Sequence, residues 1–196
     1  GQQVQEILNP DSGLYRFRPD LVFLFLDTRS VLGEIFFSPY AISDEERQLF
    51  VTKTLEHLDG LIDKLMVGTG AKIIVHNFEV PNHSPLGFLE NKQIYGLFEM
   101  VERLNFALRD KYKTVNRVFV FDYNLFVSRF GTKESFDPKL YYLGDARIAV
   151  KHLPALAREY IAYFKPILAL SKKCIVLDLD NTLWGGIVGE DGFDGI

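Results

Sequence analysis

Short runs rich in apolar residues recur along the chain and are separated by longer amphipathic stretches. Runs at residues 21–26, 72–75, 117–123 and 174–179 have the length of strands, and the first, LVFLFL, contains no polar position. An unbroken apolar run of this length is typical of a strand that is buried on both faces, as in a parallel sheet. We therefore expect these four runs to form strands.

The amphipathic stretches predict helices. Ser43 and Glu46 fit a capping box, and the apolar positions that follow keep a helical period until Gly68 and Gly70, which are credible stops. Further helical segments are expected over residues 90–112 and 145–164, with Pro154 a candidate for the first position of a fresh helix. Polar or Gly- and Pro-rich composition predicts turns and loops at residues 1–20, 79–89 and 131–142.

Strands that alternate with helices in this way predict βαβ crossovers and a sheet covered by helices on both faces. The expected fold class is therefore α/β, a three-layer α/β/α sandwich with a mostly parallel sheet. A polar, proline-containing stretch precedes the last apolar run. We place the domain boundary there, with residues 1–168 as an N-terminal domain and residues 169–196 as the beginning of a second one.

Composition narrows the class of protein. The chain has 196 residues and a formal net charge of −4, with no long basic run, which argues against nucleic acid and anionic membranes as partners. No apolar stretch reaches the length of a transmembrane helix. Cys174 is the only cysteine, so no intrachain disulfide is possible, and a reducing, cytoplasmic location is expected. The absence of an initiator Met and of a signal peptide indicates an internal piece of a longer protein.

Two aspartates lie at the carboxyl end of the last apolar run. Asp178 and Asp180 flank Leu179, and Asn181 continues the turn. Ligand sites of parallel sheets lie at the carboxyl ends of strands. One carboxylate there can act as a nucleophile near a cation that also binds a phosphate, and the second can protonate the leaving oxygen and then activate water. The alternative is that Asp-Leu-Asp-Asn is only a polar turn after a strand.

The whole string favours the first interpretation. CIVLDLDNTLWGG at residues 174–186 joins an apolar strand to DxDxT and an aromatic-Gly-Gly turn. It resembles the first motif of the haloacid dehalogenase (HAD) superfamily. The longer string KCIVLDLDNTLWGGIVGEDG is similar to the FkbH-like subfamily of these proteins.

The resemblance implies roles for individual residues. Asp178 would be the nucleophile that forms an aspartyl-phosphate, and its carboxylate would also bind Mg²⁺. Asp180 would be the general acid and base, and its backbone carbonyl would be a second Mg²⁺ ligand. The backbone at Leu179, Asp180 and Asn181 would hold the phosphate, and Thr182 would support the turn. Residues 184–192 would begin the helical turn and flap that cover the site.

Three further elements of the HAD pattern are not found in the chain. These are the Ser or Thr that binds phosphate, the Lys that neutralises it, and the late acidic pair that completes the Mg²⁺ site. In the family they follow the first motif, so we expect them beyond residue 196. Residues 1–196 alone are therefore expected not to hydrolyse phosphate esters.

The N-terminal domain of FkbH-like proteins resembles the SGNH hydrolase fold, a flavodoxin-like sandwich. Residues 19–29, 72–81 and 118–126 resemble its successive strands, and residues 141–148 lie where SGNH enzymes carry DxxH. The hydrolase signature itself is eroded. Asp27-Thr28-Arg29-Ser30 replaces the GxND block, and Ile148 stands where the histidine is expected. His152, one helical turn later, is a poor substitute, and the block that carries the nucleophilic serine would precede residue 1.

Several polar residues are expected near the carboxyl ends of the strands. They could line one cleft and bind an anionic substrate or a carrier-bound phosphopantetheine through an arginine pair. Alternatively, they cap loops and pair with one another. The set is Asp27, Arg29, His76, Asn77, Asp122, Asp145 and Arg147.

Three functions remain open. The first is a Mg²⁺-dependent HAD phosphatase or phosphotransferase that acts on a phosphorylated small molecule, with a glyceryl phosphate passed to an acyl carrier protein as the family-level example. The resemblance places it in polyketide or polysaccharide biosynthesis. The second is an inactive SGNH-like binding module that docks a carrier protein or a substrate. The third is an SGNH-type esterase or acyltransferase.

Overall fold

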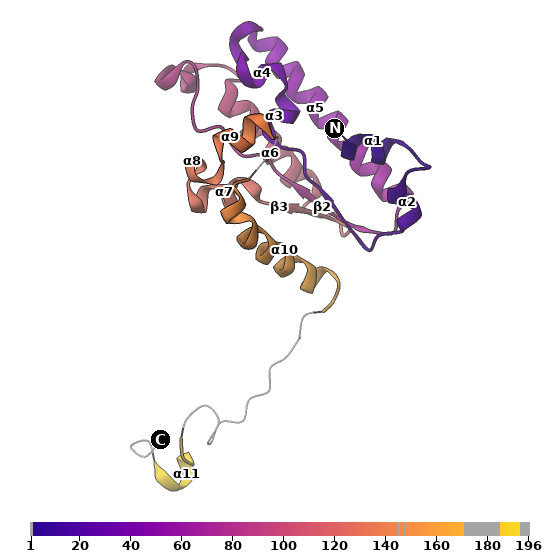
Figure 1. The fold of residues 1–196 in the computed structure, drawn as a ribbon, viewed down its shortest axis with the longest axis vertical. Helices are drawn as coiled ribbons and strands as arrows, with labels where there is room; N and C mark the ends of the chain where they lie inside the picture. Colours follow the sequence, from indigo (N-terminus) through magenta and orange to yellow (C-terminus); the bar gives the residue numbers. More distant parts are fainter. Residues whose placement is uncertain (1, 145, 147, 171–184, 193–196) are drawn as a thin grey trace. The chain divides into compact units, whose positions relative to one another are not determined.

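A computed structural model describes residues 2–144, 146, 148–170 and 185–192. The chain divides into two compact units, residues 1–156 and 157–196. The first unit contains a parallel sheet with the strand order β1-β2-β3, where β1 is Leu21–Leu24, β2 is Lys72–His76 and β3 is Val118–Phe121 (Figure 1). The predicted α/β class with a parallel sheet is confirmed, and the three predicted strands of this unit form within two residues of the ends of their apolar runs. The strand predicted at residues 174–179 lies outside the described residues.

Helices fill the connections between the strands. Before β1 the chain forms α1 (Gln2–Leu8) and α2 (Gly13–Phe17), and between β1 and β2 it forms α3 (Thr28–Leu32), α4 (Glu34–Phe37), the 3-10 turn η1 (Pro39–Ala41) and α5 (Asp44–Gly68). Between β2 and β3 the chain forms the turn η2 (Gly87–Lys92) and α6 (Leu97–Tyr112). After β3 it forms α7 (Tyr123–Phe130), α8 (Thr132–Ser135), α9 (Pro138–Leu143), η3 (Val150–His152) and α10 (Leu153–Ile167). The second unit contains α11 (Val188–Asp191).

The main hydrophobic core lies between the sheet and the two long helices α5 and α6. Strand residues such as Ile73 and Val75 are fully buried against apolar positions of both helices, including Ile62, Leu65 and Met100. The opposite face of the sheet carries a second, aromatic cluster. Because side chains alternate along a strand, His76 of β2 points to this face, where it packs against Phe25, Phe121 and Tyr123. Both faces of β2 are thus covered, and its last four residues are buried.

The start of α5 follows its predicted capping box. Ser43 Oγ accepts a hydrogen bond from the Glu46 backbone N–H, and Glu46 Oε2 accepts one from the Ser43 N–H. The helix ends at Gly68, as predicted, but not in a left-handed cap. A Cβ at Gly68 would lie 2.3 Å from the Tyr15 ring of α2, so the residue is small because another element packs against it.

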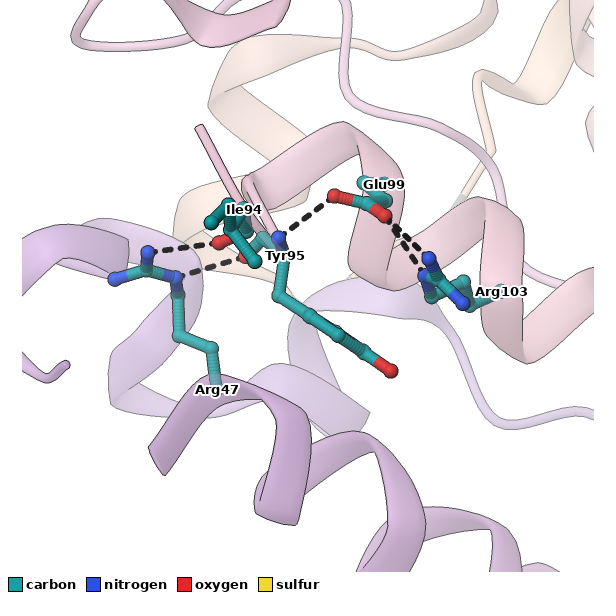
Figure 2. Close-up of polar contacts among 5 residues, drawn as sticks. All are labelled: Arg47, Ile94, Tyr95, Glu99 and Arg103. Atoms are coloured by element: carbon teal, nitrogen blue, oxygen red, sulfur yellow. Dashed lines mark hydrogen bonds and ion pairs between the residues drawn. The ribbon is translucent and has the colours of Figure 1, made fainter. Parts of the chain in front are cut away.

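The helix predicted over residues 90–112 is wrong at its start. Residues 87–92 form a 3-10 turn, Tyr95 adopts a left-handed φ of 49°, and α6 begins only at Leu97. Figure 2 shows the cause: Arg47 of α5 donates to the backbone carbonyls of Ile94 and Tyr95, at 2.9 and 2.8 Å. The Tyr95 N–H in turn donates to Glu99 Oε2 at 2.6 Å. The chain is thus held in a turn by partners from the preceding helix and from the first turn of α6.

Two of the loop predictions are wrong in part. Residues 1–20 contain α1 and α2 on either side of a turn at residues 9–12, and residues 131–142 contain α8 and most of α9. The segment 118–126, expected as one strand, changes to helix at Tyr123 because Asp122 caps α7 through the Leu125 N–H. Pro154 is the second residue of α10, which continues through Pro166.

Candidate functional site

The polar side chains at the carboxyl ends of β2 and β3 form a hydrogen-bonded network. Asn77 Nδ2 donates to Asp122 Oδ1 at 2.8 Å, and Asn77 Oδ1 accepts from the Asn124 N–H at 2.9 Å. Asn124 Oδ1 then accepts from the Val80 N–H at 2.8 Å. The network fixes the loop after β2 against the start of α7. Here the alternative that these residues cap loops and pair with one another is confirmed.

Asp27 and Thr28 attach α3 to the same loop. Asp27 caps α3 by accepting from the Ser30 N–H at 3.1 Å. The buried Thr28 hydroxyl donates to the Glu79 carbonyl at 2.7 Å. The loops after β1 and β2 are therefore joined at the carboxyl edge of the sheet.

Arg29, also of α3, turns toward α9. Its guanidinium donates to the Tyr141 carbonyl at 3.3 Å. The Cζ atom of Arg29 lies 4.4 Å from the centre of the Tyr141 ring and 5.6 Å from the centre of the Tyr142 ring. Figure 1 shows α3 and α9 close together near one end of the sheet. Asp145 and Arg147, its expected partners in an anion-binding cleft, lie outside the described residues.

His76 is buried and does not line a cleft. Its ring is 1% exposed and lies 4.3 Å from the Phe25 ring, 4.8 Å from Phe121 and 5.4 Å from Tyr123. Burial lowers the pKa of His76 to about 3, so the imidazole is neutral near pH 7. The expectation that His76 faces a polar cleft is wrong, because the alternation of β2 turns it into the aromatic cluster.

Glu79 is the residue of this edge that the sequence did not single out. It is 5% exposed, and burial raises its pKa to about 7, with the nearby Asp27 carboxylate acting in the same direction and a hydrogen bond from Thr28 opposing it. Within the described part of the chain, its Oε2 has no hydrogen-bond partner. The only signal in the sequence was an acidic residue three positions after an apolar strand and two before Pro81.

A pocket of about 210 Å³ opens beside Glu79. The segment that follows β2 provides one side, α4 provides Phe36, and the region of α8 and α9 provides the rest. The pocket therefore lies where loops beyond the carboxyl ends of parallel strands usually form ligand sites. Its walls include Phe36, Glu79, Phe136, Tyr141 and Tyr142.

The resemblance to SGNH enzymes predicts a serine-activating histidine at position 148, where this chain has isoleucine. Ile148, which stands in place of the histidine, is 8% exposed. His152 is engaged with α7 and α8, because its Nε2 lies 3.1 Å from the Glu134 carbonyl and its ring 4.4 Å from the Phe130 ring.

The predicted phosphatase residues Asp178, Leu179, Asp180 and Asn181 lie outside the described residues. In the second unit, α11 supplies a helical turn within the expected segment 184–192, and the Ile187 N–H donates to Asp191 Oδ2 at 2.8 Å. In the ranges described, no group of three His, Cys, Asp or Glu side chains could hold a metal ion. In the same ranges, no helix is long and apolar enough to span a membrane.

Comparison with known proteins decides the family. The model of the FkbH N-terminal domain matches residues 1–164. The chain belongs to the FkbH N-terminal domain family. No curated protein gives a significant match to this member of the family.

A solved structure shares the fold of this FkbH N-terminal domain. It is the crystal structure of the N-terminal part of the protein BF1531 from Bacteroides fragilis, described as containing a phosphatase domain and complexed with Mg. The TM-score is 0.73 at 24% sequence identity, over 96% of this chain and 48% of that one. At this identity the similarity shows the fold, and the chain spans about half the length of the similar structure.

Proposed function

We propose that the chain is the N-terminal part of a Mg²⁺-dependent phosphatase or phosphotransferase of the HAD superfamily, with Asp178 as its nucleophile. The observation that carries the proposal is the string CIVLDLDNTLWGG, which places two carboxylates two residues apart directly after an apolar run. Membership of the FkbH N-terminal domain family supports it. A structure with the same fold that contains a phosphatase domain and Mg adds further support.

The two aspartates have different roles, Asp178 as the nucleophile and Asp180 as the general acid and base. The Asp178 carboxylate attacks phosphorus, the bond to the leaving oxygen breaks, and Asp180 gives that oxygen a proton. Asp180 then takes a proton from water, which attacks the aspartyl-phosphate and releases inorganic phosphate and free Asp178. Backbone N–H groups at Leu179, Asp180 and Asn181 hold the phosphate oxygens.

The donor set suits Mg²⁺. The Asp178 carboxylate and the Asp180 carbonyl are hard oxygen ligands of the kind that Mg²⁺ prefers, and a bound Mg²⁺ would neutralise phosphate charge. The substrate we propose is a phosphorylated small molecule of the glyceryl-phosphate type. The proposed setting is the cytoplasm, in polyketide or polysaccharide biosynthesis, with an acyl carrier protein as acceptor.

Replacement of the nucleophile tests the proposal. In the full-length protein, Asp178→Asn is expected to lower Mg²⁺-dependent hydrolysis of p-nitrophenyl phosphate by about 10³-fold or more, because the amide cannot attack phosphorus. Chelation of Mg²⁺ should have a comparable effect. Asp110→Asn is the matched control, since Asp110 pairs with Lys113 on the exposed side of α6. Unchanged turnover in Asp178→Asn would overturn the proposal.

A second candidate function concerns the first unit. We propose that this SGNH-like domain is a binding module rather than an esterase, because Asn77 and Asp122 bind one another and Ile148 replaces the base. A carrier protein titrated into the full-length protein should shift backbone amide resonances of residues 2–156. No shift would contradict carrier docking. Covalent labelling by a fluorophosphonate probe would instead favour the esterase or acyltransferase.

A further inference from the structure

The pocket beside Glu79 has an apolar interior and a polar rim. Phe36 and Phe136 are half-buried and Tyr141 is buried, so the inner walls are mainly aromatic. The exposed residues Asn82 and Lys133 lie at the opening. An apolar cavity with few convergent polar groups is the usual form of a small-molecule site.

Glu79 is the one acidic residue among the described residues that line the pocket. Its side chain is buried, and within the described structure Oε2 lacks a hydrogen-bond partner. A buried acceptor without a partner is costly, so a ligand that donates a hydrogen bond would remove an existing penalty as well as form a contact.

The charges around the pocket favour a neutral ligand. Lys133 lines the pocket, and the Arg29 guanidinium lies over the rings of Tyr141 and Tyr142, so both positive charges disfavour a cation. The carboxyl groups of Glu79 and nearby Asp27 disfavour an anion. A donor that carries no formal charge avoids both repulsions.

We propose that this pocket binds a neutral small molecule with a flat apolar body and one N–H or O–H group that donates to the Glu79 carboxyl group. The size is adequate, because a cavity of about 150 Å³ holds benzene and this one has about 210 Å³. The aromatic walls contact the body of the ligand, and Glu79 selects for the donor. The site uses neither Asp178 nor Asp180, and it extends the function beyond phosphate chemistry.

A matched pair of probes tests the proposal in the full-length protein. Indole and benzofuran have the same shape, but indole carries an N–H donor where benzofuran carries an oxygen acceptor. Indole should bind about tenfold more tightly, as one buried hydrogen bond predicts. Backbone amide shifts should centre on residues 79–83 and 132–142. Benzylammonium should bind more weakly than indole.

Substitution of Glu79 isolates the donor contact. Glu79→Leu should abolish the preference for indole over benzofuran, whereas Glu102→Leu, on the exposed face of α6, should retain it. If Glu79→Leu does not fold, the probe pair in the wild-type protein still decides. Equal affinity for the two probes, tighter binding of benzylammonium, shifts elsewhere in the chain, or no binding of any probe would each overturn the proposal.

Discussion

Glu79 keeps a carboxyl group in the interior of the molecule, close to the carboxylate of Asp27. The other charged or titratable residues that line the same pocket are His83 and Lys133, both exposed, and the tyrosines Tyr141 and Tyr142. Burial disfavours the charged form of Glu79 and raises its pKa from 4.5 to about 7. The protonation of this one residue is therefore linked to the stability of the fold.

The sign of the linkage follows from the direction of the shift. Below pH 4.5 Glu79 is protonated in both the folded and the unfolded chain, so it has no effect on stability. As pH rises toward 7, only the unfolded chain ionises, and the free energy of unfolding falls. The stabilisation of Glu79→Gln relative to the wild type should grow by about 2 to 3 kcal/mol between pH 5 and pH 8.

Urea unfolding of both proteins at pH 5, 6, 7 and 8 measures this difference. Asp110→Asn is a suitable control, because its carboxylate is exposed on α6 and pairs with Lys113. Stability curves of Glu79→Gln and the wild type that run parallel over the whole range would contradict the prediction.

Arg47 connects two elements through backbone carbonyls. Its guanidinium donates to the carbonyls of Ile42, Ile94 and Tyr95 at 2.7 to 2.9 Å, and the residue is 5% exposed. Arg47→Leu would leave these carbonyls without their donor and should lower the free energy of unfolding by about 2 to 4 kcal/mol.

The neighbouring Arg103 provides the matched control. Its side chain is 51% exposed and pairs with Glu99 one helical turn away, as Figure 2 shows. Arg103→Leu should cost less than about 1 kcal/mol, because exposed ion pairs contribute little. The free energies of unfolding are measured by urea denaturation. An equal decrease in Arg47→Leu and Arg103→Leu would contradict the prediction.

Alanine substitutions at two glycines of α5 distinguish the effect of helix propensity from the effect of packing against another helix. Gly60 has open space where a Cβ would stand, so Gly60→Ala should stabilise the protein by about 0.5 to 1 kcal/mol. Gly68 faces the Tyr15 ring at 2.3 Å from an added Cβ, so Gly68→Ala should destabilise it by about 1 to 3 kcal/mol. Thermal unfolding midpoints that rise in both variants would show that Tyr15 does not restrict Gly68.

Local sequence signals predicted the elements that depend on local interactions. The strands and the start of α5 follow from apolar runs and from the capping pair Ser43 and Glu46. The start of α6 could not be predicted, since it depends on Arg47, which lies 48 residues before Tyr95. The short helices α7 to α9 were missed because their aromatic residues gave no helical period over so few positions.

The candidate site was predictable only in part for the same reason. Acidic and amide residues after the strands were expected at the carboxyl edge, and Asp27, Asn77 and Asp122 lie there. Whether such a residue binds a ligand or a neighbouring loop depends on contacts between distant segments. Glu79 was missed because its burial arises from the packing of α3 and its pocket from α4, α8 and α9.

At the scale of the whole molecule, the chemistry proposed for the chain lies in two places. Asp178 and Asp180 carry the phosphatase proposal, and the pocket beside Glu79 carries a separate binding proposal. The tests do not overlap, since Asp178→Asn removes phosphate release, whereas Glu79→Leu removes discrimination between two neutral probes. Each proposal can therefore fail without the other.

The pH dependence of global stability combines two buried groups with opposite signs. Burial lowers the pKa of His76 from 6.5 to about 3, so stability is lost as pH falls below 6.5 and the unfolded chain alone takes up a proton. Glu79 has the reverse effect from pH 4.5 to 7. Between pH 4.5 and 6.5 the two contributions should nearly cancel in the wild-type protein.

Single and double variants can resolve this compensation. His76→Phe keeps an aromatic ring among Phe25, Phe121 and Tyr123 but cannot be protonated. Relative to the wild type, its free energy of unfolding should increase by about 2 kcal/mol between pH 7 and pH 5. Glu79→Gln should show the opposite trend, and the double variant should follow the wild-type slope between pH 4.5 and 6.5. If His76→Phe and the wild type keep a constant difference from pH 7 to pH 5, the pKa of His76 is the same in the folded and the unfolded chain, and the prediction is wrong.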